Sequence, residues 1–317
     1  MGSGDEARQD ARKTHLYLRL GIIGAVVLLA ISILLEFAKA GCIQTSVSAY
    51  YYTPVRAIFV GSLCAVGLSL IVYKGRTVAE DAALNGAGML APVVAVAPTI
   101  DVGGCYSVPP NPLPKEAGEL ANWVVTNIQN NFNALLIAGV IGLGVAVVLA
   151  VVTARLADQS IPETVRRVDP ATRISLLGTG AALLLGWLLS AFWRDFDTKA
   201  HGWSAVAMFG FLILAIVFRA WSYRQQDDSV WRIYVGVAVL MILGAAVIVG
   251  TRVFGRHTVF WLETWEIFWF LAYWVAQTVK NWRETLERVR SASTVAASGP
   301  SAGFHAGSPG PLSRKAR

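Results

Sequence analysis

Long apolar runs separated by short polar segments dominate this chain. A helix needs about 20 predominantly apolar residues to cross the ~30 Å hydrocarbon core of a membrane, and eight runs are about this long. They lie at residues 17–37, 55–73, 84–100, 132–154, 174–193, 203–221, 230–250 and 260–279. Because the runs are continuous rather than alternating, each predicts a helix and not a strand. Pro92 and Pro98 lie in the third run and predict a kink there.

The composition agrees with a membrane protein. Of the 317 residues, 55% are hydrophobic and 15% are charged, and the mean hydropathy is +0.53. A soluble domain carries about 25% charged residues, so an ordinary soluble domain is excluded. The sequence therefore predicts an all-α fold, a polytopic transmembrane helix bundle with about eight spans.

The positive charges indicate an orientation. Eight spans would place 20 of the 27 lysines and arginines on one side and 7 on the other. The richer side is cytoplasmic by the positive-inside rule, which puts both termini in the cytoplasm. We expect a cytoplasmic N-terminal segment at 1–16, a transmembrane domain at 17–282 and a mostly disordered, basic cytoplasmic tail at 283–317. The same rule accounts for the net charge of +7, so we expect membrane lipids and no nucleic acid as partners.

The predicted external loop, residues 101–131, contains two parts. A turn-rich stretch comes first, and Val124, Ile128 and Phe132 then recur every four residues, as on one face of a helix. This helix is either a lid over an external cavity or an extension of the fourth span. Cys42 and Cys105 both lie on the external side, where an oxidising compartment allows a disulfide between them. Their spacing leaves open whether they approach closely enough.

Ionisable residues gather near the external ends of the predicted spans. Glu263 and Glu266 lie in the first turns of the eighth span, and Glu266 is about 9 Å inside it at 1.5 Å per residue. Buried charges need a partner. We predict Arg56 for Glu266, and the alternatives on the same side are His201, Arg194 and Arg252. Such a carboxylate either pins two helices together, binds a ligand or a proton, or faces interfacial water.

Familiar catalytic signatures are absent from the sequence. We find no nucleophile elbow, no phosphate-binding loop and no Cys-x-x-Cys pair. The four histidines are too scattered to predict a zinc centre, which needs three protein ligands in one place. We therefore expect no metal and no cofactor, and a non-catalytic role is favoured over an enzyme.

A polar motif precedes the second span. It comprises Ser46, Ser48, Tyr50, Tyr51, Tyr52 and Thr53, with Arg56 following. On physical grounds the three tyrosines predict an interfacial aromatic belt. Together with Glu80, Asp81 and Asn85, the motif resembles uncharacterised bacterial multi-spanning membrane proteins with a Ser-x-Ser-x-Tyr-Tyr-Tyr-Thr motif, a family distantly similar to the Frag, DRAM and Sfk type. This resemblance, over residues 44–99, implies a helical membrane fold in the plasma membrane, an external polar cluster and an internal one.

These observations favour a membrane protein that binds a lipid headgroup or a small polar ligand in an external pocket. We expect the motif residues from Ser46 to Arg56 to line it with His201, Glu263 and Glu266. The alternatives are a proton-coupled transporter that uses Glu266 and a membrane enzyme acting on lipid. Small residues recur every four positions at Ala138, Gly142, Ala146 and Ala150. They favour close helix packing, either within the chain or in a homo-oligomer.

Overall fold

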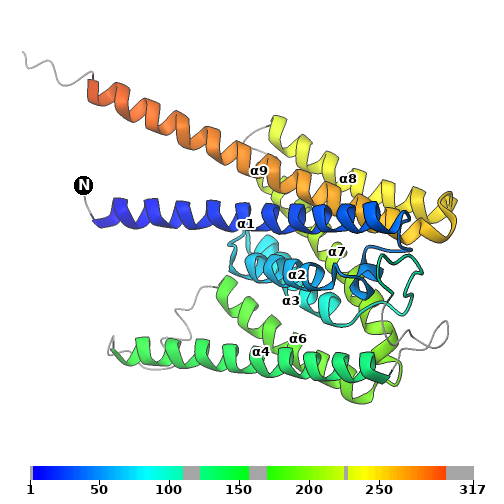
Figure 1. Cartoon of the computed structure of the whole chain (residues 1–317). Helices are drawn as coiled ribbons and strands as arrows, with labels where there is room; N and C mark the ends of the chain where they lie inside the picture. Colours follow the sequence, from blue (N-terminus) through cyan, green and yellow to red (C-terminus); the bar gives the residue numbers. More distant parts are fainter. Residues whose placement is uncertain (1–2, 110–121, 157–169, 225–227, 298–317) are drawn as a thin grey trace, which may run out of the picture. The chain divides into compact units, whose positions relative to one another are not determined.

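The computed structural model describes residues 3–109, 122–156, 170–224 and 228–297, and every regular element within these ranges is helical. The α-helices are α1 (Ser3–Ala40), α2 (Arg56–Val72), α3 (Val78–Val96), α4 (Asn122–Leu156), α6 (Pro170–Phe192), α7 (Phe196–Tyr223), α8 (Asp228–Thr251) and α9 (Thr258–Ala297) (Figure 1). Two 3-10 helices, η1 (Ser48–Tyr52) and η2 (Gly255–His257), precede α2 and α9. Each predicted apolar run falls on one α-helix, so the all-α prediction is confirmed.

The chain divides into a compact unit, Met1–Val275, and a second unit, Ala276–Arg317. Within the first unit, α3 packs against α2 and α7, while α1 packs on α2 and α8 on α7. Helix α3 approaches its neighbours closely because Ala83, Ala87 and Ala91 are buried on it. Its Gly88 meets Gly67 of α2, where a Cβ on either glycine would lie 2.7 Å from the carbonyl oxygen of the other.

Four stretches are long and apolar enough to cross a membrane, which indicates a multi-pass membrane protein. They are Lys13–Ala40, Asn122–Thr153, Phe196–Tyr223 and Ser229–Thr251. Within the described residues the prediction of eight spans is therefore wrong. The apolar stretches Arg56–Val72 and Leu176–Phe192 are too short, since 17 residues of helix cover about 25 Å.

Helices α3 and α9 are not candidate membrane spans because polar residues interrupt their apolar stretches. The first turns of α3 contain Glu80, Asp81 and Asn85, and Glu263 and Glu266 interrupt the apolar stretch of α9. The sidedness of the bundle stays a prediction. The end that carries Cys42 and Cys105 is called the disulfide end below, and the opposite end of α1 and α7 is called the arginine end.

Two further expectations concern the connections. Helix α4 runs without interruption from Asn122 to Leu156, so the amphipathic stretch before residue 132 extends the fourth predicted span. Helix α9 continues to Ala297, so residues 283–297 of the tail that was expected to be mostly disordered are helical. Residues 298–317 of the tail and 110–121 of the loop lie outside the described residues.

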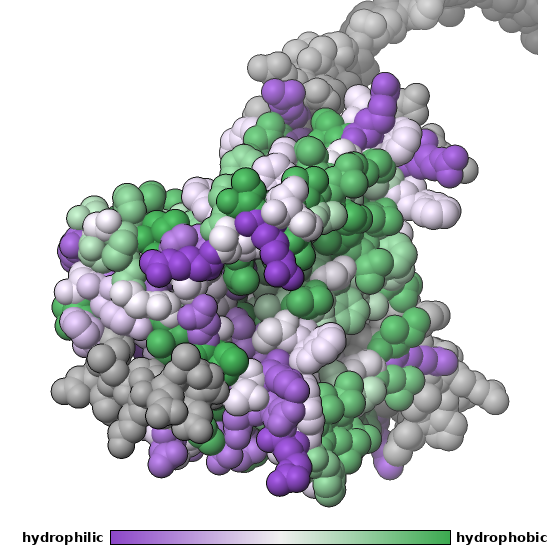
Figure 2. Space-filling view, turned by 90° about the vertical axis from the view of Figure 1, so that its right-hand side faces the viewer, coloured by the Kyte–Doolittle hydropathy of each residue, from purple (hydrophilic) through white to green (hydrophobic). Residues whose placement is uncertain are grey.

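Apolar side chains cover much of the described surface. On α1, Leu28, Ile31, Leu34 and Leu35 are exposed, as expected for contact with lipid. Figure 2 looks at the disulfide end, where hydrophilic residues lie among hydrophobic patches. Ala138, Gly142 and Ala146 of α4 are exposed as well, because Gly139, and not Gly142, is the position that approaches Leu183 of α6.

Candidate functional site

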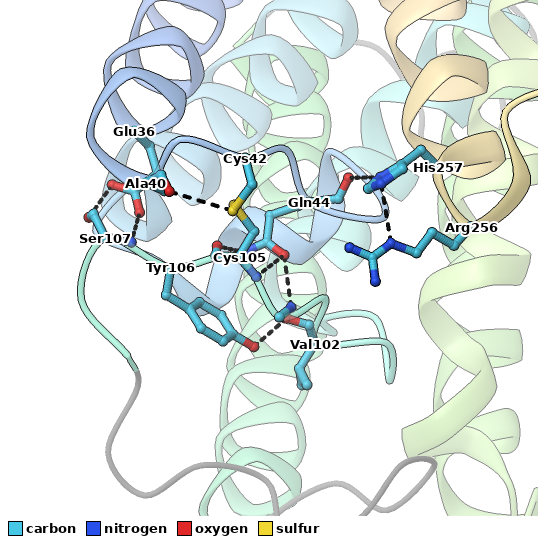
Figure 3. Close-up of a disulfide and its surroundings, with 11 residues drawn as sticks. Glu36, Ala40, Cys42, Gln44, Val102, Cys105, Tyr106, Ser107, Arg256 and His257 are labelled. Atoms are coloured by element: carbon cyan, nitrogen blue, oxygen red, sulfur yellow. Dashed lines mark hydrogen bonds between the residues drawn. A yellow bond between two sulfur atoms is a disulfide. The ribbon is translucent and has the colours of Figure 1, made fainter.

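The segments that follow α1 and α3 are joined at the disulfide end (Figure 3). Cys42 and Cys105 form a disulfide, with their Cα atoms 5.8 Å apart. The buried Gln44 side chain lies beside it, where its Nε2 donates to the Cys105 carbonyl and its Oε1 accepts from the Gly104 amide at 3.2 Å. On the other side, Nδ1 of His257 lies 3.0 Å from the Gln44 carbonyl oxygen. Through its side chain and its backbone carbonyl, Gln44 thus connects three separate segments.

Glu36 belongs to the same arrangement. Its carboxylate accepts hydrogen bonds from the amide and the hydroxyl of Ser107, at 2.9 and 2.7 Å. Gly103, with φ of +78°, has Gln44 Oε1 in the position that a Cβ would occupy, so glycine is required there on both counts. These contacts hold the end of α1 and the segment that follows it against the segment that follows α3, so they have a structural role.

The tyrosine motif folds into η1, and its side chains point inward. Tyr50, Tyr51 and Tyr52 are 1%, 2% and 4% exposed, so the prediction of an interfacial belt is wrong. The physical reason is that Val124 and Ile128 of α4 join the same buried apolar cluster and cover the rings. Burial also raises the pKa of Tyr52, whose phenol stays neutral and donates to the Thr99 carbonyl at 2.8 Å.

Two motif hydroxyls serve the local backbone. Ser46 Oγ accepts from the Ala49 amide at 2.9 Å, and Thr53 Oγ1 donates to the Tyr50 carbonyl at 2.8 Å. Thr53 Oγ1 also accepts from the Val55 amide at 3.2 Å. Ser46 and Thr53 therefore fix the turn that leads into α2, which explains their presence without a ligand.

Ser48 is different, because it connects two ionisable side chains from distant helices. Its Oγ donates to Glu263 Oε1 of α9 at 2.7 Å and lies 2.8 Å from Nε2 of His201 on α7. His201 Nδ1 lies 2.6 Å from the Ala97 carbonyl oxygen, which only accepts, so Nδ1 carries a proton. The other Glu263 oxygen accepts from the Val47 amide at 2.6 Å and the Ser48 amide at 3.3 Å. Glu263, Ser48 and His201 are called the triad below.

Arg56 does not reach the triad. Its guanidinium donates to the Tyr51 hydroxyl at 2.6 Å, and it lies 4.3 Å from the centre of the Tyr51 ring and 5.6 Å from that of Trp123. Burial raises the pKa of Tyr51, and the Arg56 charge opposes that rise. The predicted pairing of Arg56 with Glu266 is therefore wrong, because aromatic rings and a phenol satisfy the arginine instead.

Glu266 lies on α9 and is 4% exposed. Neither of its carboxyl oxygens has a hydrogen-bond partner among the residues that the structure describes. The sequence correctly indicated a carboxyl in need of a partner. The tertiary structure decides whether a cation pairs with Glu266. None of the expected cations lies within hydrogen-bonding distance of its carboxyl oxygens.

A cavity of about 70 Å³ adjoins the triad. Side chains from α1, α2, α3, α7 and α9 line it, and they are apolar except for Ser48, Ser62 and Glu263. Ser62 Oγ is buried and has no hydrogen-bond partner among the described residues. The apolar part of the lining includes Val26, Leu29, Phe59, Val66, Met208, Phe209, Leu212 and Phe270. A carboxylate and a free hydroxyl thus face an otherwise apolar space.

A second buried polar cluster occupies the arginine end, and sequence reasoning missed most of it. Arg19 of α1 and Arg219 of α7 both donate to the Tyr73 hydroxyl, at 2.6 and 2.7 Å. Arg219 Nε also lies 3.0 Å from Glu80 Oε1, and both side chains are buried. The count of positive charges in the sequence had placed Arg19 and Arg219 on the cytoplasmic side as ordinary surface charges. Their position in the ends of predicted spans, and not in loops, was the signal of a buried role.

Glu80 and Asp81 also organise the start of α3. Glu80 accepts from the Arg76 amide at 2.8 Å, and Asp81 accepts from the Gly75 amide at 3.0 Å and pairs with Lys74 at 3.1 Å. Of the internal cluster that the resemblance implies, Glu80 and Asp81 therefore lie together, and their contacts are those of a helix start and an ion pair.

Comparison with known protein families, with curated proteins and with solved structures found no match to this chain. The resemblance of residues 44–99 to Frag, DRAM and Sfk-type proteins therefore stays a prediction. Within the described ranges no three His, Cys, Asp or Glu side chains are grouped closely enough to hold a metal ion. The cavity beside the triad is the strongest candidate site.

Proposed function

We propose that this chain is an integral protein of the plasma membrane that binds a primary ammonium group in the cavity beside Glu263. The ammonium belongs either to a lipid headgroup or to a free small amine. One observation carries the proposal: a carboxylate faces a cavity whose lining, in the described part of the chain, includes no lysine, arginine or histidine. A half-buried carboxylate that faces an apolar cavity without a cation in its lining attracts a positively charged ligand.

The hydrogen-bonding capacity supports the same ligand. A carboxylate has about four acceptor positions, and Glu263 uses three of them for Val47 N, Ser48 N and Ser48 Oγ. One position is left for an ammonium N–H. The free hydroxyl of Ser62 offers a second acceptor across the cavity.

The volume limits the size of the group. A cavity of about 150 Å³ holds benzene, with its six carbon atoms, so the 70 Å³ found beside Glu263 corresponds to about three non-hydrogen atoms. Ethylamine has this size, and its ethyl group would contact apolar residues such as Phe59 and Met208. A headgroup with a primary ammonium on a two-carbon stem presents the same chemistry.

The test has two arms, one for each source of ammonium. In the first, ethylamine hydrochloride is titrated into purified protein, and thermal unfolding is compared with sodium chloride at the same ionic strength. In the second, lipids retained after mild extraction are quantified by mass spectrometry. We expect wild type to gain thermal stability or to retain ammonium-headgroup lipid selectively, and Glu263→Gln to lose either effect.

Glu36→Gln is the matched control, because Glu36 is also buried at the disulfide end and does not line the cavity. It should bind like wild type, apart from any loss of stability. If Glu263→Gln binds as wild type does, or if wild type shows neither effect, the proposed function is wrong.

A second candidate function is proton-coupled transport, and Glu266 is the observation that favours it. A buried carboxyl without a hydrogen-bond donor is better accommodated with its proton than without it, so it is suited to binding and releasing one. In proteoliposomes, Glu266→Gln should abolish the part of pH-gradient-driven ethylamine uptake that exceeds the passive uptake of protein-free liposomes. Uptake that persists with the same pH dependence would exclude this carboxyl from the mechanism.

A further inference from the structure

The triad contains two short contacts and one hydroxyl hydrogen. Ser48 Oγ lies 2.7 Å from Glu263 Oε1 and 2.8 Å from His201 Nε2, and a hydrogen bond at each contact needs its own hydrogen. His201 Nδ1 is protonated because it faces the Ala97 carbonyl, so in a neutral ring Nε2 is an acceptor. Ser48 supplies one hydrogen. The second must come from a proton on Glu263 or on Nε2 of His201.

Both placements fill the network. With the proton on Nε2, the imidazolium donates to Ser48, and Ser48 donates to the Glu263 carboxylate. With the proton on Glu263, the carboxyl donates to Ser48, and Ser48 donates to a neutral His201. Rotation of a single hydroxyl converts one arrangement into the other. Without the proton, two lone pairs face each other at one of the contacts, which is unfavourable in a buried site.

We propose that Glu263, Ser48 and His201 share one dissociable proton and that an ammonium ligand displaces it. This inference rests on the proposed function. The ammonium donates one N–H to Glu263 Oε1 and a second N–H to Ser48 Oγ, so neither oxygen is left with unpaired lone pairs, while Ser48 donates to neutral His201. The protonated triad and one ammonium ion give the ammonium complex and one free proton, so charge and atoms balance. Ligand binding at this cavity is then an exchange of one proton for one cation.

Other titratable groups that the structure describes on the neighbouring elements do not hydrogen-bond to Glu263 or His201. Glu36 of α1 accepts from Ser107, and Arg56 of α2 donates to Tyr51. The described titratable groups around the triad are Glu36, Tyr50, Tyr51, Tyr52, Arg56, Asp195, Asp197, Lys199, Arg256, His257 and Glu266. Glu266 lies one helical turn from Glu263, so Glu266→Gln is the control that isolates its influence.

The first experiment needs no ligand. Nitrogen-15 NMR of histidine-labelled protein follows the four histidines with pH, and the signal that is lost in His201→Gln identifies His201. The side-chain amide introduced by Glu263→Gln would donate to Ser48 as a protonated carboxyl does. We therefore expect Glu263→Gln to keep His201 neutral, with its proton on Nδ1, from about pH 5 to 8, the range in which an ordinary histidine titrates. Glu266→Gln should leave the His201 titration unchanged.

Ser48→Ala separates a shared proton from a simple effect of charge, because Glu263 and His201 both remain. It should change the His201 titration by removing the link between the two groups. If wild-type His201 gains a proton in this pH range, an unchanged His201 titration in both Glu263→Gln and Ser48→Ala would overturn the inference. So would an equal change in Glu266→Gln. If wild-type His201 stays neutral throughout, the shared proton lies on Glu263 and the proton count below decides.

The second experiment counts protons and distinguishes this inference from the proposed function. Calorimetric titration of wild type with ethylamine hydrochloride at several pH values, in two buffers of different ionisation enthalpy, should show proton release that approaches one proton per ligand as the pH is lowered. Binding without proton release would overturn the shared proton and leave the proposed function standing. Absence of binding in both arms would overturn both. Because wild type alone decides this result, it holds even if a variant fails to fold.

Discussion

Replacing Glu80 with glutamine should destabilise the protein strongly. Glu80 pairs with Arg219 at 3.0 Å, and the side chains of Arg219 and Glu80 are 6% and 0% exposed. Arg19 donates to the same Tyr73 hydroxyl as Arg219, so one carboxylate is set against two buried guanidinium groups. Glutamine keeps the shape and an acceptor for the Arg76 amide but removes the negative charge. Both arginines are then buried without it.

The magnitude follows from the burial of this pair. Removing one partner of a buried ion pair costs about 3–5 kcal/mol, because the other charge is left without compensation. Arg219→Met in the Glu80→Gln background removes the guanidinium group that has lost its paired carboxylate. We expect the double variant to be less destabilised than the two single changes predict, with a coupling energy of about 2 kcal/mol.

Unfolding in mixed detergent micelles, followed by circular dichroism, measures each free energy of unfolding. Lys74→Met is the matched control, because Lys74 pairs with Asp81 while its own side chain is 62% exposed, and exposed pairs contribute at most about 1 kcal/mol. A Glu80→Gln variant within about 1 kcal/mol of wild type, or additive single and double changes, would refute the reasoning.

Two further predictions concern covalent and steric constraints. Reduction of the Cys42–Cys105 disulfide, or serine at both positions, should lower stability by at most about 4 kcal/mol, since the bond closes a loop of 63 residues. The loss should be smaller if the enclosed helices persist in the unfolded state, and no loss would contradict a constraining role. Gly67→Ala should cost about 1–3 kcal/mol, because its Cβ would lie 2.7 Å from the Gly88 carbonyl, whereas Gly61→Ala has open space and should be neutral or stabilising. Equal thermal stability of the two alanine variants would show that the helix crossing is not tightly packed.

The helices could be located from the sequence because hydrophobic runs are a local signal. Every described α-helix coincides with a predicted run, since an apolar segment that avoids water must satisfy its own backbone hydrogen bonds. The number of membrane crossings could not be predicted as well from the sequence. Runs such as 84–100 count as spans by hydropathy, but α3 begins among Glu80, Asp81 and Asn85 and packs between α2 and α7.

The sequence by itself determined which polar residues lie near each predicted end of the bundle, because position along a helix fixes depth. It nominated Ser48, His201 and Glu263 as residues of an external pocket and Glu266 as a carboxyl in need of a partner. Only the tertiary structure decided the partners: it joined Ser48 to His201 and Glu263, gave Arg56 to Tyr51, and left Glu266 without a hydrogen bond among the described residues. These pairings depend on how helices that are far apart in the sequence rotate and pack against one another. Ser48 and His201, for example, are separated by 153 positions, and no local sequence pattern encodes that geometry.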